Sequence, residues 1–333
     1  MTSNLTINYN RNYNCKLLTM NAILSRVLPS SQLLWSQAGL VTYENDDYLY
    51  LTPNYLDDFG YLKKVANIDT IENKQDNMVN FLTDLNARLE KGYTVMICVD
   101  VFDLPFNMYY KQQNSNHYIE VVGMEGNKLL ICDHFYKYTG AVDSVVIEQA
   151  MRRRMNIDSK GYYSFIYFNV ENHCFKIDIQ YLLNVMAINN SIILGKEEMK
   201  LYEMTGYKRT IGLKTFEIFN KFLINQLHLN GPLQRIYRDL FNLSNSRYHY
   251  SDVLYAFKDE YPELDKIVNI YRDIAQSYRI ASNLVLKLRA SKKDDSYYTN
   301  ISKILDSVLC KEKEASYQID NFLKSKSQDV KNY

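Results

Sequence analysis

The stretch NHYIEVVGMEGNKLLICDHF, residues 116–135, holds two apolar runs joined by a short polar turn. The runs YIEVVGM and KLLIC are rich in β-branched and large apolar residues, which favour strands. Gly126 and Asn127 between them tolerate the positive φ of a tight turn. The stretch therefore predicts a β-hairpin that brings His117, at the start of the first strand, near Asp133, at the end of the second.

His117 and Asp133 have two interpretations. An imidazole that acts as a base needs a carboxylate on its other nitrogen, which fixes the tautomer and stabilises the imidazolium. A histidine and an aspartate at the ends of a hairpin are also ordinary polar strand ends, so the pair alone does not decide between the two. His134 points to the opposite face if the strand continues, and is a poor substitute for His117.

The bulk properties narrow the class of protein. A length of 333 residues predicts two domains. No apolar run is long enough to span a membrane, and the N-terminus lacks a basic head followed by an apolar run, so we expect a cytoplasmic protein. A net charge of +1, with 39 basic and 38 acidic residues, gives no reason to expect nucleic acid or a membrane as the main partner.

The first half of the chain mixes helices and strands. CKLLTMNAILSRVL predicts a helix that begins at Cys15 with Asn14 as its N-cap, and its apolar face contains Met20, Ile23, Leu24 and Val27. Further helices are predicted for DNMVNFLTDLNARLEKG and SVVIEQAMRRRM, and further strands for YTVMICVDVFDLPF and GYYSFIYFNV. These elements predict an α+β domain with an antiparallel sheet over residues 1–176.

From residue 177 the pattern changes to successive helices. Apolar residues recur at helical spacing, among them Phe216, Phe219 and Leu223, and later Ile267, Ile270 and Ile274. Residues 177–333 are therefore predicted to form an all-helical bundle domain, whose stripes are core or, alternatively, line a ligand site. The basic cluster MRRRM at residues 151–155 is either a solvated helix face or a docking patch for an acidic partner.

The five cysteines differ in their predicted surroundings. Cys15, in the first turn of a helix, faces unsatisfied backbone N–H groups and the positive end of the helix dipole, which favour a nucleophilic thiolate. Cys98 and Cys132 lie inside apolar strand runs and are expected to be inert, whereas Cys174 and Cys310 fall in a loop and a helix. The cysteine spacing fits neither a metal site nor a disulfide framework, and no nucleotide-binding or zinc-protease motif occurs. We expect no metal.

Residues 99–135 resemble the N-terminal domain of the butirosin-biosynthesis H proteins. The shared features are an Asp-x-x-x-Leu-Pro-aromatic loop beginning at Asp100, the His117-aromatic pair, an apolar strand ending in glycine, and Asp133 after the second strand. NYNCKLLTMNAIL, with Cys15 opening a helix, resembles the start of that family. The wider group is similar to papain-like (C39-like) cysteine enzymes, so the resemblance implies that fold and a triad of Cys15, His117 and Asp133.

The resemblance implies acyl transfer. An acyl or aminoacyl group would leave the phosphopantetheine thioester of an acyl- or peptidyl-carrier protein, rest on Cys15 and pass to the amine of a small antibiotic-like acceptor. The phosphopantetheine would be a donor arm and not a permanently bound cofactor. The alternatives are a cysteine hydrolase or peptidase with the same triad, and a noncatalytic module that binds a carrier protein or synthetase. The sequence leaves open whether the protein forms a homodimer.

Three further residues are candidates for binding substrate. Papain-like enzymes place a glutamine before the cysteine as an oxyanion donor; here Asn10 or Asn12 would have to supply that amide, beside the backbone N–H of Cys15. Both asparagines are otherwise ordinary loop residues. Asp100 either binds the ammonium group of the acceptor or caps a turn.

Overall fold

The computed structural model describes residues 6–45, 48–158, 161–196, 201, 203–228, 233–290 and 295–329. Contacts between residues divide the chain into two compact units. Unit 1 contains residues 1–32 and 62–174, and unit 2 contains residues 33–61 and 175–333. Residues 33–61, expected in the first domain, group with unit 2 through their contacts. The chain leaves unit 1 within the short 3-10 helix η1 (Ser31–Leu34) and returns to it within the α-helix α2 (Asp58–Ala66).

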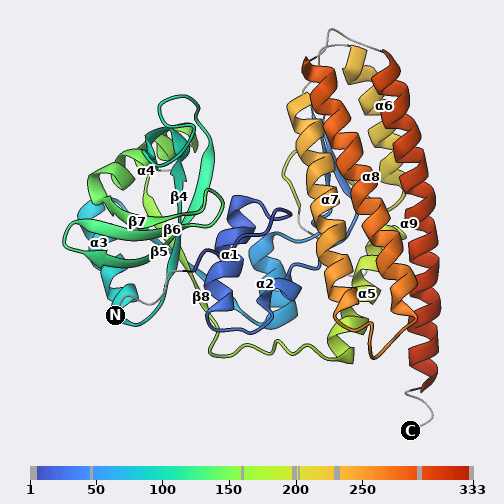
Figure 1. Ribbon diagram of the computed structural model, residues 1–333, viewed down its shortest axis with the longest axis horizontal. Helices are drawn as coiled ribbons and strands as arrows, with labels where there is room; N and C mark the ends of the chain where they lie inside the picture. Colours follow the sequence, from blue (N-terminus) through green and yellow to red (C-terminus); the bar gives the residue numbers. More distant parts are fainter. Residues whose placement is uncertain are drawn as a thin grey trace. The chain divides into compact units, whose positions relative to one another are not determined.

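Unit 1 is built on an antiparallel sheet with the strand order β3-β8-β4-β5-β6-β7 among the described residues (Figure 1). The strands are β3 (Asp69–Gln75), β4 (Val95–Asp100), β5 (Asn116–Glu125), β6 (Lys128–Asp133), β7 (Tyr138–Asp143) and β8 (Tyr163–Asn169). Its helices include α1 (Cys15–Ser25), α3 (Met78–Glu90) and α4 (Ser144–Asp158). The predicted mixture of helices and antiparallel strands is confirmed.

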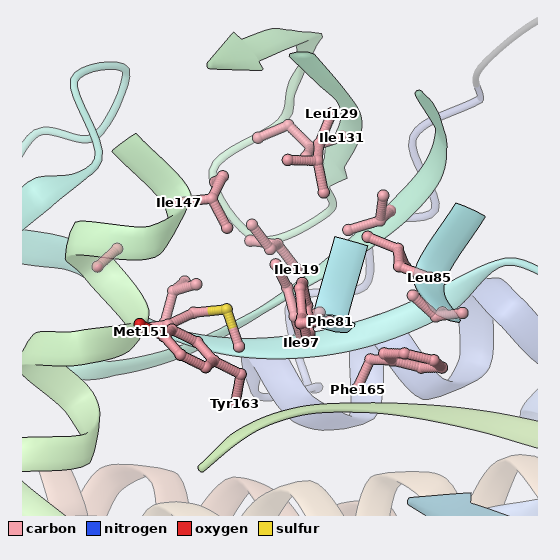
Figure 2. Packing of buried hydrophobic residues seen from close by; sticks show 14 of the residues in the cluster. Phe81, Leu85, Ile97, Ile119, Leu129, Ile131, Ile147, Met151, Tyr163 and Phe165 are labelled. Carbon is pink, nitrogen blue, oxygen red and sulfur yellow. The ribbon is translucent and has the colours of Figure 1, made fainter. Parts of the chain in front are cut away.

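The core of unit 1 lies between the sheet and two helices (Figure 2). Phe81 and Leu85 of α3 and Ile147 of α4 contribute fully buried side chains, as do Ile119 of β5 and Ile131 of β6. Each such side chain contributes about 1.5–3 kcal/mol to folding. Because β5 and β6 are held by this core, the residues at their ends have fixed positions.

Helix α1 packs against β5. Its predicted start is confirmed, and Met20, Ile23 and Leu24 are buried as expected. Val27, also expected on the apolar face, is instead 55 % exposed because the helix ends at Ser25. Cys15 is therefore carried by a helix whose buried face is fixed on the strand of His117.

The three arginines of the basic cluster contact unit 1 itself. Arg152 pairs with Glu148, Arg153 Nε lies 2.6 Å from Asp103 Oδ2, and Arg154 Nε donates to Cys98 Sγ at 3.2 Å. Cys98 is only partly buried. Burial raises the pKa of its thiol, although Arg154 opposes this shift.

Unit 2 combines a small sheet with helices. Its strands are β1 (Val41–Glu44), β2 (Leu49–Thr52) and β9 (Lys208–Ile211), in the order β2-β1-β9. Its helices beyond residue 177 are α5 (Ile179–Ile193), α6 (Lys214–His228), α7 (Leu233–Tyr255), α8 (Leu264–Ala290) and α9 (Asp295–Asp329). Helix α8 packs against both α7 and α9 (Figure 1). The helical C-terminal region is confirmed, but β9 was not predicted.

The apolar stripes of unit 2 are core, as the main interpretation predicted. Phe216, Phe219 and Leu223 of α6 are buried, and so are Ile267 and Ile274 of α8, whereas Ile270 is only partly buried. Within the described residues, none of the helices has the length and apolar character needed to cross a membrane.

Candidate active site

Cys15 is the first residue of α1, directly after the N-cap Asn14. The side-chain oxygen of Asn14 accepts the backbone N–H of Leu17 at 2.9 Å, which satisfies one of the N–H groups that a first turn leaves open. Thr19 Oγ1 lies 2.9 Å from the carbonyl oxygen of Cys15 and 3.1 Å from that of Tyr118. The Thr19 hydroxyl thus links the first turn of α1 to β5 at Tyr118, the residue after His117.

His117 and Asp133 form a direct hydrogen bond. The distance from His117 Nε2 to Asp133 Oδ2 is 2.7 Å, and both side chains are buried. The other oxygen of the carboxylate, Oδ1, accepts the backbone N–H groups of Phe135 and Tyr136 at 3.1 and 3.0 Å. Since both oxygens of Asp133 accept hydrogen bonds, the carboxylate has a fixed orientation. His117 uses Nε2 in this bond, so its Nδ1 is left for another partner.

The Cys15 thiol also interacts with the imidazole of His117. Burial opposes protonation of the imidazole, but hydrogen bonds and charge from Asp133 and Cys15 outweigh it and raise the pKa of His117 from 6.5 to about 9. The imidazole is therefore protonated at neutral pH, between a carboxylate and a thiol. Such a site can hold a thiolate–imidazolium pair.

A β-bulge explains why Asp133 reaches His117. Close to the Gly126 turn, Glu125 pairs with Lys128 and Gly123 with Leu130, but the register shifts between Val121 and Gly123, so that Glu120 pairs with Cys132. Extended by one residue, this register places Asp133 opposite Ile119 and thus on the same face as His117. If the register did not shift, Asp133 would be opposite Glu120, on the other face of the sheet.

The same register gives His134 a different partner. His134 Nε2 lies 2.9 Å from Glu120 Oε2, and both side chains are fully buried. Glu120 also accepts two hydrogen bonds from Arg26, Nε to Oε1 and Nη2 to Oε2, each at 2.9 Å. The expectation that His134 points away from His117 agrees with this pairing.

Aromatic residues cover the histidine. The ring centroid of Tyr136 is 4.9 Å from that of His117, and the centroid of Phe135 is 6.0 Å away. Burial raises the pKa of the Tyr136 hydroxyl, and the nearby Asn107 side chain partly offsets this shift. These side chains screen the His117–Asp133 bond from water. Tyr136 was not predicted, because it comes after the last residue of the strand pattern.

The remaining predicted residues have structural contacts of their own. Asn10 Oδ1 accepts the backbone N–H of Asn12 at 2.9 Å, which makes a local turn before α1. Asp100 Oδ1 caps the turn after β4 by accepting the N–H of Phe102 at 2.9 Å and that of Ser115 at 3.3 Å. Asp100 Oδ2 is buried and accepts no hydrogen bond from the described residues. The structure thus brings Cys15, His117 and Asp133 together, and gives Asn10 and Asp100 turn-forming contacts.

The raised pKa of His117 predicts a pH-dependent contribution to stability. The stabilisation is fully present below pH 6.5, the pKa of the imidazole in the unfolded chain. It is lost as pH rises through about 9, the pKa of His117 in the folded protein. The free energy of unfolding lost in His117→Gln should therefore be about 3 kcal/mol larger at low pH than above the folded pKa. Urea unfolding across this range tests it, with the exposed His173→Gln as control. An unchanged difference at every pH would contradict the prediction.

A buried histidine that is hydrogen-bonded to a buried carboxylate and interacts with a cysteine at the start of a helix provides the groups of a cysteine-nucleophile centre. Residues 43–134 match the family model described as butirosin biosynthesis protein H, N-terminal. The resemblance predicted from sequence is confirmed over these residues, which are less than half of the chain and include His117 and Asp133 but not Cys15. No curated protein matches the chain.

Proposed function

We propose that this protein is a cysteine-dependent acyltransferase that moves an acyl or aminoacyl group from a carrier-protein thioester to the amine of a small secondary-metabolite acceptor. The observation that carries the proposal is the position of His117, which is hydrogen-bonded to Asp133 at 2.7 Å and interacts with the Cys15 thiol. The family match supports a biosynthetic role related to acyl transfer.

In the first step the Cys15 thiolate attacks the carbonyl carbon of the donor thioester. The carbon–sulfur bond to the phosphopantetheine arm then breaks, and the imidazolium of His117 gives its proton to the leaving thiolate. The products are acyl-Cys15, a neutral His117 and a free carrier thiol. Thioester exchange is nearly balanced in free energy, so this step needs no other source of energy.

In the second step the neutral His117 accepts a proton from the acceptor amine as its nitrogen attacks the acyl-Cys15 carbonyl. The bond to Cys15 Sγ breaks, the amide leaves, and the thiolate–imidazolium pair is restored. Asp133 keeps Nε2 of His117 engaged throughout, so that the other ring nitrogen faces the reaction. The backbone N–H of Cys15 is a donor for the developing oxyanion, with Asn10 or Asn12 as the proposed second donor.

The buried Oδ2 of Asp100 supports a further part of the proposal. A carboxylate oxygen without a hydrogen bond in the described residues is costly to bury, and an ammonium group would satisfy it. Asp100 is directly opposite Asn116 in the pairing of β4 and β5, at the ends of these strands where His117 also lies. It is therefore a candidate for binding an ammonium group of the acceptor other than the neutral amine that attacks acyl-Cys15.

Acylation of Cys15 tests the proposed function. We expect a panel of short acyl-pantetheine thioesters to leave an acyl mass on the peptide that contains Cys15, because the thiol is paired with His117. The adduct should be absent in Cys15→Ser and unchanged in the control Cys174→Ser, since Cys174 is an exposed thiol outside the site. Adducts confined to Cys174 and Cys310, or none from any donor, would contradict the proposal.

A further inference from the structure

We propose that Glu120 is a positioning residue that aligns the helix of Cys15 with the hairpin of His117 and Asp133. The inference rests on the proposed function, because it concerns the geometry of that same centre. Glu120 is fully buried in the middle of β5, in a strand run that is otherwise apolar. A carboxylate in such a place is costly unless every oxygen is paired.

The partners of Glu120 come from the segments that carry the candidate triad. Arg26, the C-cap residue of α1, makes a two-pronged ion pair with the carboxylate, both bonds at 2.9 Å. This joins the far end of the Cys15 helix to the strand of His117. Two parallel bonds to a planar guanidinium fix direction as well as distance, so the pair resists rotation of the helix on the sheet.

His134 extends the network to the other two segments. Its Nδ1 accepts the backbone N–H of Asn8 at 3.1 Å, so that Nε2 carries the hydrogen that is donated to Glu120 at 2.9 Å. Asn8 lies in the segment that leads into Cys15, and His134 directly follows Asp133. One carboxylate therefore connects the segments before and after Cys15, the strand of His117 and the end of the strand of Asp133.

The charge of Glu120 is essential to this arrangement. Burial would raise the pKa of the carboxyl, but hydrogen bonds from His134 and Arg26 outweigh burial and lower it, so Glu120 is ionised. By strand alternation Glu120 and His117 are on opposite faces of β5, so Glu120 does not touch the reacting atoms. It acts through the placement of α1 and of the residue after Asp133.

The test uses the full chain and compares Glu120→Gln with the double variant Arg26→Met/Glu120→Gln, which leaves no unpaired charge. The readouts are the thermal unfolding midpoint and the rate at which iodoacetamide modifies Cys15 relative to the exposed Cys174, measured across pH by peptide mass spectrometry. Asp69→Asn is the control, because it removes an exposed ion pair of unit 1 with Lys63.

We expect both Glu120 variants to lower the Cys15-to-Cys174 rate ratio at low pH on the order of 10-fold, since small misplacements of reacting groups have large effects on rate. The double variant should regain much of the unfolding midpoint but not the ratio, and Asp69→Asn should change neither. A wild-type ratio and pH profile in the folded double variant would overturn the positioning role. If the ratio is low in the wild type itself, the proposed thiolate–imidazolium centre fails instead.

Discussion

Alkylation of Cys15 by iodoacetamide at low pH is expected to slow on the order of 10- to 100-fold when His117 is replaced by alanine. Iodoacetamide reacts with the thiolate, and the imidazolium of His117 stabilises that form. The pKa of His117, raised to about 9, keeps the imidazole charged over the whole neutral range, so its effect on the Cys15 rate should persist there. The difference between wild type and His117→Ala should narrow only as pH rises through about 9.

The control for this prediction is His173→Ala. His173 is exposed and lies in the loop after β8, so its loss should leave the pH profile of Cys15 unchanged. Peptide mass spectrometry follows all five cysteines in the same sample, and Cys174 and Cys310 report the behaviour of exposed thiols. Equal Cys15 profiles in wild type and His117→Ala would mean that the hairpin is structural.

Replacing Arg247 by methionine is expected to lower the free energy of unfolding by about 3–5 kcal/mol, because it leaves a buried carboxylate without a counter-charge. Arg247 of α7 and Glu312 of α9 are fully buried, and Nε and Nη2 both lie 2.8 Å from Glu312 Oε1. Arg247 Nη1 also donates to the carbonyl oxygen of Gly39 at 3.1 Å. Urea unfolding followed by circular dichroism measures the change.

The double variant Arg247→Met/Glu312→Leu should recover most of this loss, since an apolar pair of similar volume removes the buried charge altogether. Lys266→Met is the matched control: Lys266 pairs with Glu314 at 3.5 Å on the surface, where ion pairs contribute little. A loss in Arg247→Met no larger than in Lys266→Met would contradict the account of the bundle core.

Much of the centre follows from local sequence signals. The alternation and turn of residues 116–135 predict the hairpin, and Asn14 before an apolar helix pattern predicts where α1 begins, so Cys15, His117 and Asp133 could each be located on an element. Whether the side chains of His117 and Asp133 meet depends on the register of the hairpin. The bulge between Val121 and Gly123 decides which face Asp133 occupies, and no local propensity predicted it.

The contacts between distant segments were beyond the sequence patterns. Glu120 interrupts an apolar strand run, which signals a buried charge with a partner, but Arg26 and His134 come from other segments and could not be identified. Strand β9 was missed because KRTI has two charged residues and no alternation, and it forms by pairing with β1. Val27 was misplaced because periodicity does not show where α1 ends.

The most direct measurement of the central claim is the fate of acyl-Cys15 in a single turnover. After loading from an acyl-pantetheine thioester and removal of excess donor, the acyl-enzyme is mixed with a panel of primary amines that includes aminosugars, and products are followed by mass spectrometry. We predict that at least one amine discharges Cys15 faster than water does and carries away the acyl group as an amide. Release of only the free acid, at a rate that no amine changes, would contradict acyl transfer and identify a hydrolase.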